Sequence, residues 1–254
     1  MKKDIYTPIL SIPILGIIFG ELMIFSGDIY YGLGLYIFNL LAIIFKTIFS
    51  PLEIKIKNIL QSLTLLIILR MISISIPQFF SNPISQYPLI YGIMFVPIYS
   101  TIKNQQISSK ELGIDFRKLY IYFPIALIIG SIIAIIEYKI LNPVALINDI
   151  SLSDIVFLII IMFVFIGLIE EILFRSILQT RIEKVLGSKS GILLSGILFG
   201  IMHASYGIIG EILFASIFGI VLGYIFYKTR SLPFTVSIHG SANVLLYGIL
   251  PKLV

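Results

Sequence analysis

Nine stretches of the chain are long and apolar enough to be candidate membrane spans, and this pattern constrains the fold more than any other feature. A transmembrane helix needs about 20 predominantly apolar residues. The candidate stretches occupy residues 5–27, 29–50, 58–80, 85–102, 119–138, 152–180, 190–206, 208–228 and 232–249. No alternating ten-residue pattern typical of a β-barrel is present, so helices are the expected spanning elements. The sequence therefore predicts an all-α polytopic membrane protein with eight to nine transmembrane helices.

Composition supports the same fold class. The 254 residues are 58% hydrophobic and 12% charged, whereas a soluble domain is typically about 25% charged. The net charge of +5 does not indicate a nucleic-acid partner, because the basic residues are scattered between apolar stretches and form no patch. The chain has no cysteine, which excludes disulfides and thiolate metal sites. We expect the lipid bilayer to be the main surrounding of the protein, and the sequence does not predict its oligomeric state.

The connections between the stretches predict an orientation. Lysine and arginine gather in cytoplasmic loops. Nine spans put fourteen of the 18 basic residues on the side of the N-terminus, namely Lys2, Lys3, Lys46, Lys55, Lys57, Lys103, Lys110, Arg117, Lys118, Arg181, Lys184, Lys189, Lys228 and Arg230. Only Lys139 and Lys252 fall on the other side. The pattern favours a cytoplasmic N-terminus, and eight spans result if one of the last short stretches does not cross.

The polar loop 103–118 separates two predicted regions. Residues 1–118 comprise the N-terminal helices and this loop, and residues 119–254 comprise a C-terminal region with a functional core at about 152–249. We expect that core to use the last four helices, because the unusual polar residues lie there.

Two adjacent carboxylates and an arginine interrupt the stretch 152–180. Glu171 and Arg175 are separated by four residues, with the acid first, which favours an ion pair on one helix face. Glu170 points about 100° away on an α-helix and shares its face with Gly167 and Phe174. The simplest interpretation is a structural pair beside a free carboxylate with room at Gly167, which can act as a general base. The alternative is that all three charges only hold helices together.

A histidine ends the stretch 190–206, in the sequence Phe199-Gly-Ile-Met-His203. Gly196 and Gly200 form a G-x-x-x-G pattern, which allows a neighbouring helix to approach closely. His203 lies seven residues after Gly196, on nearly the same face, so we expect it to point into a tight helix contact. A single histidine of this kind can also serve only as a hydrogen-bond partner between helices.

The second of the two histidines lies in His239-Gly-Ser-Ala-Asn243. His239 and Asn243 share one helix face, and small residues separate them. At 1.5 Å per residue, Glu170, His203 and His239 lie about 16, 20 and 13 Å from the basic loops on the same side. The three groups can therefore occupy one layer in the cytoplasmic half of the membrane.

In their order and spacing, these motifs (EExxxR, FxxxH and HxxxN) resemble the CPBP family, also called the Abi family. The family contains the type II CAAX prenyl endopeptidases of the Ras-converting-enzyme type, together with bacteriocin-processing or immunity-related proteins. The resemblance covers about residues 152–249, the C-terminal two-fifths of the chain. It implies an intramembrane glutamate-dependent protease without a metal or other cofactor. Its expected partner is a membrane-associated peptide or protein, and some members cut after a prenylated cysteine.

The resemblance also implies roles for individual residues. Glu170 with His203 would activate the attacking water, and His239 with Asn243 would stabilise the oxyanion. Glu171 and Arg175 would support the site. We expect packing roles for Gly167, Gly196, Phe199 and Gly200.

Three other functions stay open at the level of sequence. Two histidines and a glutamate can bind a catalytic zinc ion, although no H-E-x-x-H motif is present. Buried charges such as Arg70, Glu21 and Glu211 also occur in transporters and proton relays. A catalytically inactive scaffold or immunity protein is the third alternative. Outside the motifs, we expect Arg70 to pair with Glu21, and Glu137 to extend towards an interface.

Overall fold

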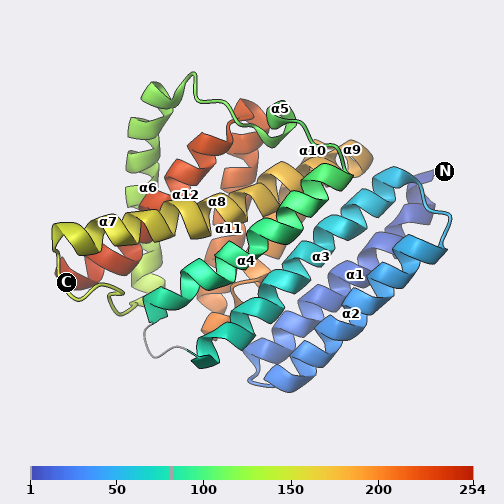
Figure 1. Cartoon of the computed structure of the whole chain (residues 1–254), viewed down its shortest axis with the longest axis horizontal. Coiled ribbons are helices and arrows are strands. Elements are labelled where there is room, and N and C mark those ends of the chain that lie inside the picture. The colour runs from blue at the N-terminus through green and yellow to red at the C-terminus, as the bar shows by residue number, and fades with distance from the viewer. Residues whose placement is uncertain (1, 80–82, 254) are drawn as a thin grey trace.

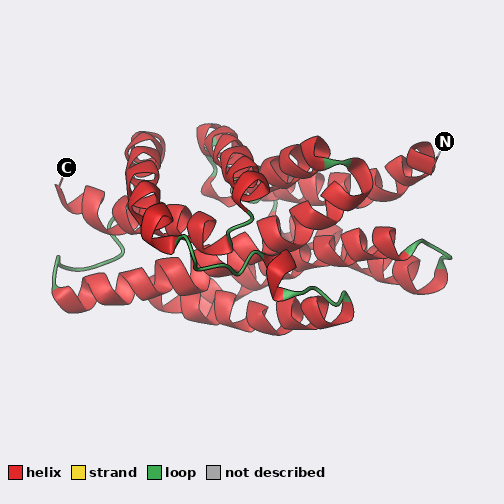
Figure 2. Cartoon of the chain, turned by 90° about the horizontal axis from the view of Figure 1, so that it is seen from above, coloured by secondary structure: helices red, strands yellow, loops and turns green. Residues whose placement is uncertain are grey.

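The computed structural model describes residues 2–79 and 83–253, and within them all regular structure is helical (Figures 1 and 2). The helices are α1 (Lys2–Phe25), α2 (Ile29–Phe49), α3 (Ile54–Ser75), η1 (Ile76–Phe79), α4 (Pro83–Asn104), α5 (Ser109–Leu112), α6 (Leu119–Leu141), α7 (Leu152–Ile160), η2 (Ile161–Gly167), α8 (Leu168–Glu171), η3 (Ile172–Gln179), α9 (Thr180–Leu186), α10 (Ser188–Ile201), η4 (Ala204–Tyr206), α11 (Ile209–Thr229), α12 (Leu232–Val244), η5 (Leu245–Ile249) and α13 (Leu250–Leu253). The predicted all-α class is confirmed. The predicted span 58–80 ends on Phe80, which lies outside the described residues.

The N-terminal helices form one side of the molecule. Figure 1 shows α1, α2, α3 and α4 running side by side, with α3 in contact with α1, α2 and α4. The continuous run from α7 to α9 lies beside α4. Beyond it, α10 packs on α11, and α12 packs on α6. The run from α7 to α9 therefore lies between the N-terminal helices and the last helices of the chain.

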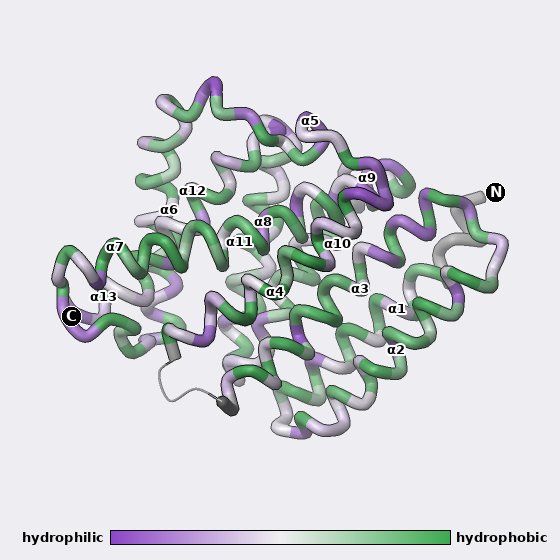
Figure 3. Tube along the Cα trace, in the orientation of Figure 1, coloured by the Kyte–Doolittle hydropathy of each residue, from purple (hydrophilic) through white to green (hydrophobic). Residues whose placement is uncertain are grey.

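Within residues 2–79 and 83–253, six helical segments are long and apolar enough to cross a membrane, which supports a multi-pass protein. They are Pro8–Phe25, Ile29–Phe49, Ile54–Ser75, Leu119–Leu141, Leu152–Leu186 and Ile209–Thr229. Figure 3 shows hydrophobic residues along the long helices, with hydrophilic residues around α5 and α9. The 14 residues of α10 reach only about 21 Å, which is less than the apolar thickness of a bilayer. The count of eight to nine spans therefore stays a prediction.

One hydrophobic core joins the two regions predicted from the sequence. Its fully buried members include Leu63 of α3, Ile169 of α8 and Ile238 of α12. Burial of such side chains removes apolar surface from the surroundings and fills the space between the helices. The boundary at residues 118 and 119 stays a prediction, because this core extends across it.

Two π-helical segments flank the short α-helix that carries the adjacent glutamates. η2 (Ile161–Gly167) precedes α8 and η3 (Ile172–Gln179) follows it. Hydrogen bonds in a π-helix run from residue i to i+5, and such segments occur frequently at functional sites. The direction of side chains along this run therefore departs from the regular 100° steps on which the sequence prediction rests.

Glycines allow close contacts between two pairs of helices in the C-terminal region, α10 with α11 and η2 with α12. A Cβ atom on Gly196 would lie 2.6 Å from the Ile220 nitrogen of α11, and one on Gly200 would lie 2.4 Å from the Ser216 nitrogen. The predicted close contact through the G-x-x-x-G pattern is present. Gly167 is also packed, because a Cβ there would lie 2.8 Å from the Met162 oxygen and 3.5 Å from the Gly240 nitrogen. The expected free space beside Gly167 is thus occupied by backbone.

The variant Gly200→Ala tests this packing. Its new methyl group would meet the α11 backbone, so we expect the free energy of unfolding to fall by about 1–3 kcal/mol. Thermal unfolding of the detergent-solubilised protein measures the effect. Gly34→Ala is the matched control, because nothing lies within 4 Å of a Cβ at that helical position. Equal unfolding midpoints for the two variants would contradict the close contact between α10 and α11.

Candidate active site

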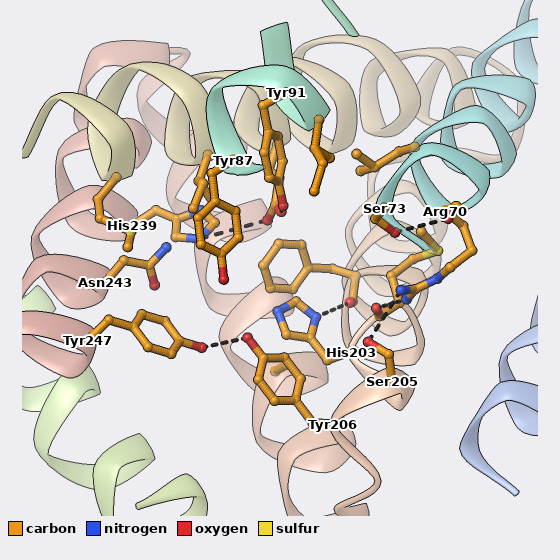
Figure 4. Close-up of a pocket in the computed structure, with 18 of the residues that line it drawn as sticks. Arg70, Ser73, Tyr87, Tyr91, His203, Ser205, Tyr206, His239, Asn243 and Tyr247 are labelled. Carbon is orange, nitrogen blue, oxygen red and sulfur yellow. Dashed lines mark hydrogen bonds and ion pairs between the residues drawn. The ribbon is translucent and has the colours of Figure 1, made fainter. Parts of the chain in front are cut away.

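The four predicted catalytic side chains line one cavity of about 330 Å³. Glu170 comes from α8, His203 from the turn after α10, and both His239 and Asn243 from α12. Figure 4 shows His203, His239 and Asn243 in this cavity, together with four tyrosines, Tyr87, Tyr91, Tyr206 and Tyr247. Residues that are more than 30 positions apart in the sequence thus meet in one space. The single layer suggested by the depths of about 16, 20 and 13 Å estimated from helix rise agrees with this arrangement.

The Glu171 carboxylate links α8 to α12. Arg175 Nε donates to Glu171 Oε2 at 3.1 Å, and His239 Nδ1 lies 3.1 Å from Glu171 Oε1. The side chains of Glu171 and Arg175 are completely buried. The ion pair predicted from the sequence is therefore present, and the contact with His239 is an additional one. It fixes the ring of His239 with Nδ1 towards Glu171.

Aromatic rings surround the remainder of the Arg175 guanidinium. Its central carbon lies 5.0 Å from the centroid of Phe199 and 5.8 Å from that of Phe174. A guanidinium over an aromatic face gains a favourable electrostatic interaction. Phe199 also contacts both histidines, with ring centroids 4.8 Å from His203 and 5.7 Å from His239. Phe199 therefore packs between the buried ion pair and the two imidazoles.

Glu170 faces the cavity and has a partner that the sequence analysis missed. The hydroxyl of Tyr91 on α4 donates to Glu170 Oε1 at 2.5 Å. The other oxygen, Oε2, lies 3.8 Å from His239 Nε2, which is too long for a hydrogen bond. No lysine or arginine among the described residues forms an ion pair with Glu170. Tyr91 lies in an apolar helix outside the three motifs, and nothing in its local sequence distinguishes it from the other 13 tyrosines.

His203 stands on the turn that ends α10. Its Nδ1 lies 2.8 Å from the carbonyl oxygen of Phe199. A carbonyl only accepts, so this contact places a proton on Nδ1 and leaves Nε2 of the neutral ring as an acceptor. The described residues provide no direct hydrogen bond between His203 and Glu170. A connection between these two groups would therefore need a molecule in the cavity.

Two charged residues outside the motifs also line the cavity. Arg70 pairs with Glu21, with its Nε 2.5 Å from Glu21 Oε1, so this predicted pair is confirmed. Glu137 is only 7% exposed and faces the same cavity. The expectation that Glu137 extends towards an interface is wrong, because α6 packs on α12 and turns this residue inwards.

A second polar cluster lies between α5 and α9, away from the cavity. Glu111 pairs with Arg181, whose Nη1 lies 2.5 Å from Glu111 Oε1, and with Lys184. Partial burial acts to raise the pKa of Glu111, but hydrogen bonds from Lys184 and Arg181 outweigh it and hold this pKa below its ordinary value. These ion pairs connect loop 103–118 to α9, the last helix of the run from α7 to α9.

The described residues do not form a metal site of the usual kind. No group of three or more His, Asp or Glu side chains within residues 2–79 and 83–253 is arranged to hold a metal ion. The two histidines and Glu170 line one cavity, but they approach it from separate helices.

Comparison with known families agrees with this arrangement. Residues 152–245 match the family model of the type II CAAX prenyl endopeptidases, Rce1-like. The match confirms the resemblance found in the motifs. It covers Glu170, His203, His239 and Asn243. Searches of curated proteins and of solved structures gave no match. The helices α1–α6, with Tyr91 and Arg70, lie outside the matched residues.

The variant Tyr91→Phe tests the contact with Glu170. It keeps the aromatic ring and removes one hydrogen bond to a carboxylate, which is worth about 1.5–3 kcal/mol. We expect the free energy of unfolding to fall by at most this amount, and kcat for peptide cleavage to fall about tenfold or more because Glu170 loses the contact that orients it. Tyr87→Phe is the control, since the Tyr87 hydroxyl makes no hydrogen bond among the described residues while its ring contacts that of Tyr91. Equal kcat values for both variants would argue against a role for Tyr91.

The variant Glu171→Ala tests the buried ion pair. It leaves the guanidinium of Arg175 buried without its counter-charge, which typically costs about 3–5 kcal/mol. We expect a large fall in the unfolding midpoint, at least as marked as the loss of activity. Asp149→Ala, in the exposed loop before α7, provides a control for removal of a carboxylate. A Glu171→Ala protein of parental stability would contradict the structural role.

Proposed function

We propose that the protein is an intramembrane endopeptidase that hydrolyses a peptide bond of a membrane-associated substrate with a glutamate-activated water. The observation that supports this function is the shared cavity, in which a carboxylate, two imidazoles and an amide face one another. Peptide hydrolysis needs a base for the water and donors for the developing negative charge. The family match over residues 152–245 supports the same class of reaction.

Glu170 is the proposed general base. The hydroxyl of Tyr91 donates to Oε1 of Glu170, so Oε2 is free to accept a proton. In His203, Nδ1 is occupied by the Phe199 carbonyl, so Nε2 is the free acceptor. A water held between these two atoms would lose a proton to Glu170 as its oxygen bonds to the substrate carbonyl carbon. The proton would pass to the leaving nitrogen when the carbon–nitrogen bond breaks, so the carboxylate is regenerated.

His239 and Asn243 are the proposed oxyanion donors. The side-chain amide of Asn243 supplies an N–H group without any change of protonation. His239 already directs Nδ1 to Glu171, so its donation through Nε2 needs a second proton on the ring. Glu170 Oε2 lies 3.8 Å from Nε2, too far for direct transfer, so that proton would reach the ring through a water molecule in the cavity. In this mechanism Glu171 and Arg175 hold the ring in place and do not contact the substrate.

We infer that the cavity lies in the cytoplasmic half of the membrane, with a cytoplasmic N-terminus. The support is the distribution of basic residues between the apolar stretches. The description of the matching family, type II CAAX prenyl endopeptidase, supports a substrate with a C-terminal CAAX sequence. Incubation of the pure protein with a prenylated CAAX peptide and with its unprenylated twin determines whether the lipid is required.

The variants Glu170→Gln and His203→Ala test the mechanism. We expect both to lose at least about 100-fold in kcat, the scale of general acid–base catalysis, while remaining folded. Glu211→Gln is the control, because this carboxylate is buried but does not line the cavity. Parental turnover by Glu170→Gln would remove the basis of the proposal.

A zinc-dependent mechanism is the nearest alternative, and chelation distinguishes it. The glutamate mechanism predicts full activity after exhaustive treatment with a chelator. Complete loss that zinc restores would show a metalloenzyme instead. A transporter would show solute flux in proteoliposomes that persists in Glu170→Ala, with no cleavage of any peptide by the parent protein.

A further inference from the structure

Arg70 connects the N-terminal helices to the turn that carries His203. This residue lies on α3, is 5% exposed and borders the cavity (Figure 4). Its Nη2 donates to the carbonyl oxygen of Met202, and its Nη1 lies 3.3 Å from the hydroxyl of Ser205. The two contacts fall immediately before His203 and two residues after it. One guanidinium therefore makes hydrogen bonds to the chain on both sides of His203.

The contact with Met202 has a clear physical reason. α10 ends at Ile201, and the last carbonyl groups of a helix have no partner within it. The C-terminus of a helix also carries partial negative charge, which favours a cation. Arg70 provides the donor and the charge from another helix. It thereby acts as a C-terminal cap for α10, at the point where the chain turns and His203 adopts φ −92° and ψ 5°.

The guanidinium itself is held by two further N-terminal helices. Its Nε donates to Glu21 of α1, whose Oε1 also accepts from the hydroxyl of Tyr36 on α2 at 2.5 Å. Glu21 and Tyr36 are fully buried. Tyr36 lies 3.9 Å from the sulfur of Met202 as well. A lysine could not reproduce this arrangement, because its ammonium is a point charge without the planar fork of donors.

We propose that Arg70 is a positioning residue for His203, so that α1, α2 and α3 complete an active site whose motifs lie wholly in residues 152–245. The proposal rests on the proposed function in that His203 acts on the water. Arg70 does not contact the reacting atoms in this scheme. Arg70 sets the position of the imidazole because it holds Met202 and Ser205, which precede and follow His203 in the chain.

The double variant Glu21→Gln/Arg70→Met separates positioning from stability. It removes both charges together, so no buried charge loses its partner, and the remaining cost is the hydrogen bond to the Met202 carbonyl. The oxygen of the introduced side-chain amide would still accept the hydrogen bond from Tyr36. We expect an unfolding midpoint near that of the parent, a kcat lower by about 10- to 100-fold, and a nearly unchanged KM, since a displacement of about 1 Å can cost 100-fold. Parental kcat in this double variant would overturn the proposal.

Two further variants make the result specific. Ser205→Ala keeps the buried ion pair and removes one contact of Arg70, so we expect a smaller fall in kcat with unchanged stability. Glu111→Gln/Arg181→Met is the matched control, because Arg181 is also buried, at 4% exposure, and pairs with a glutamate away from the cavity. It should keep the parental kcat. An equal loss in this control would show that any buried arginine pair has the same effect.

Hydrogen–deuterium exchange gives a readout that does not depend on peptide cleavage. We expect the backbone amides of residues 202–207 to exchange faster in Glu21→Gln/Arg70→Met than in the parent, and those of α12 to stay unchanged. Unchanged exchange in the turn would overturn the positioning role. If the parent cleaves no peptide, the proposed function fails, while exchange still decides whether Arg70 orders the turn.

Discussion

The site depends on the buried carboxylate of Glu171, which contacts both Arg175 and His239. A lone charge in an apolar bundle is costly, and each of these groups reduces the cost for the others. The carboxylate lies on α8 and the imidazole on α12, so this contact also fixes the register between the two helices. The neighbouring carboxylate of Glu170 can then face the cavity, because Glu171 already balances the charge of Arg175.

Much of this arrangement follows from the sequence. The length of the apolar stretches dictates helices, and the i, i+4 spacing of Glu171 and Arg175 dictates their pair. The small residues at Gly196 and Gly200 predict the close approach of a neighbouring helix, which in the structure is α11. These features are local, so they are visible within one helix. The expected partner of Arg70 was also correct, since few buried acids are available to balance it.

Other features could not be read from the chain because they arise from contacts between distant elements. Tyr91 reaches Glu170 across 79 positions, and no local pattern marks it. The π-helical segments around α8 change the side-chain directions that regular helix geometry predicts. The inward position of Glu137 depends on the packing of α6 against α12. The free space assigned to Gly167 was wrong for a similar reason, because backbone atoms of η2 and α12 fill it.

The wide turns of η2 and η3 have a consequence for sequence change in this segment. A π-helical turn holds one residue more than an α-helical turn, so each acts as a built-in insertion. In a regular α-helix, one extra residue would rotate everything after it by about 100°. The wide turn of η2 takes up that residue locally, so α8 keeps its direction relative to α7. Deletion of a single residue from η2 would therefore restore regular winding and leave the side chains of Glu170 and Glu171 close to their present directions.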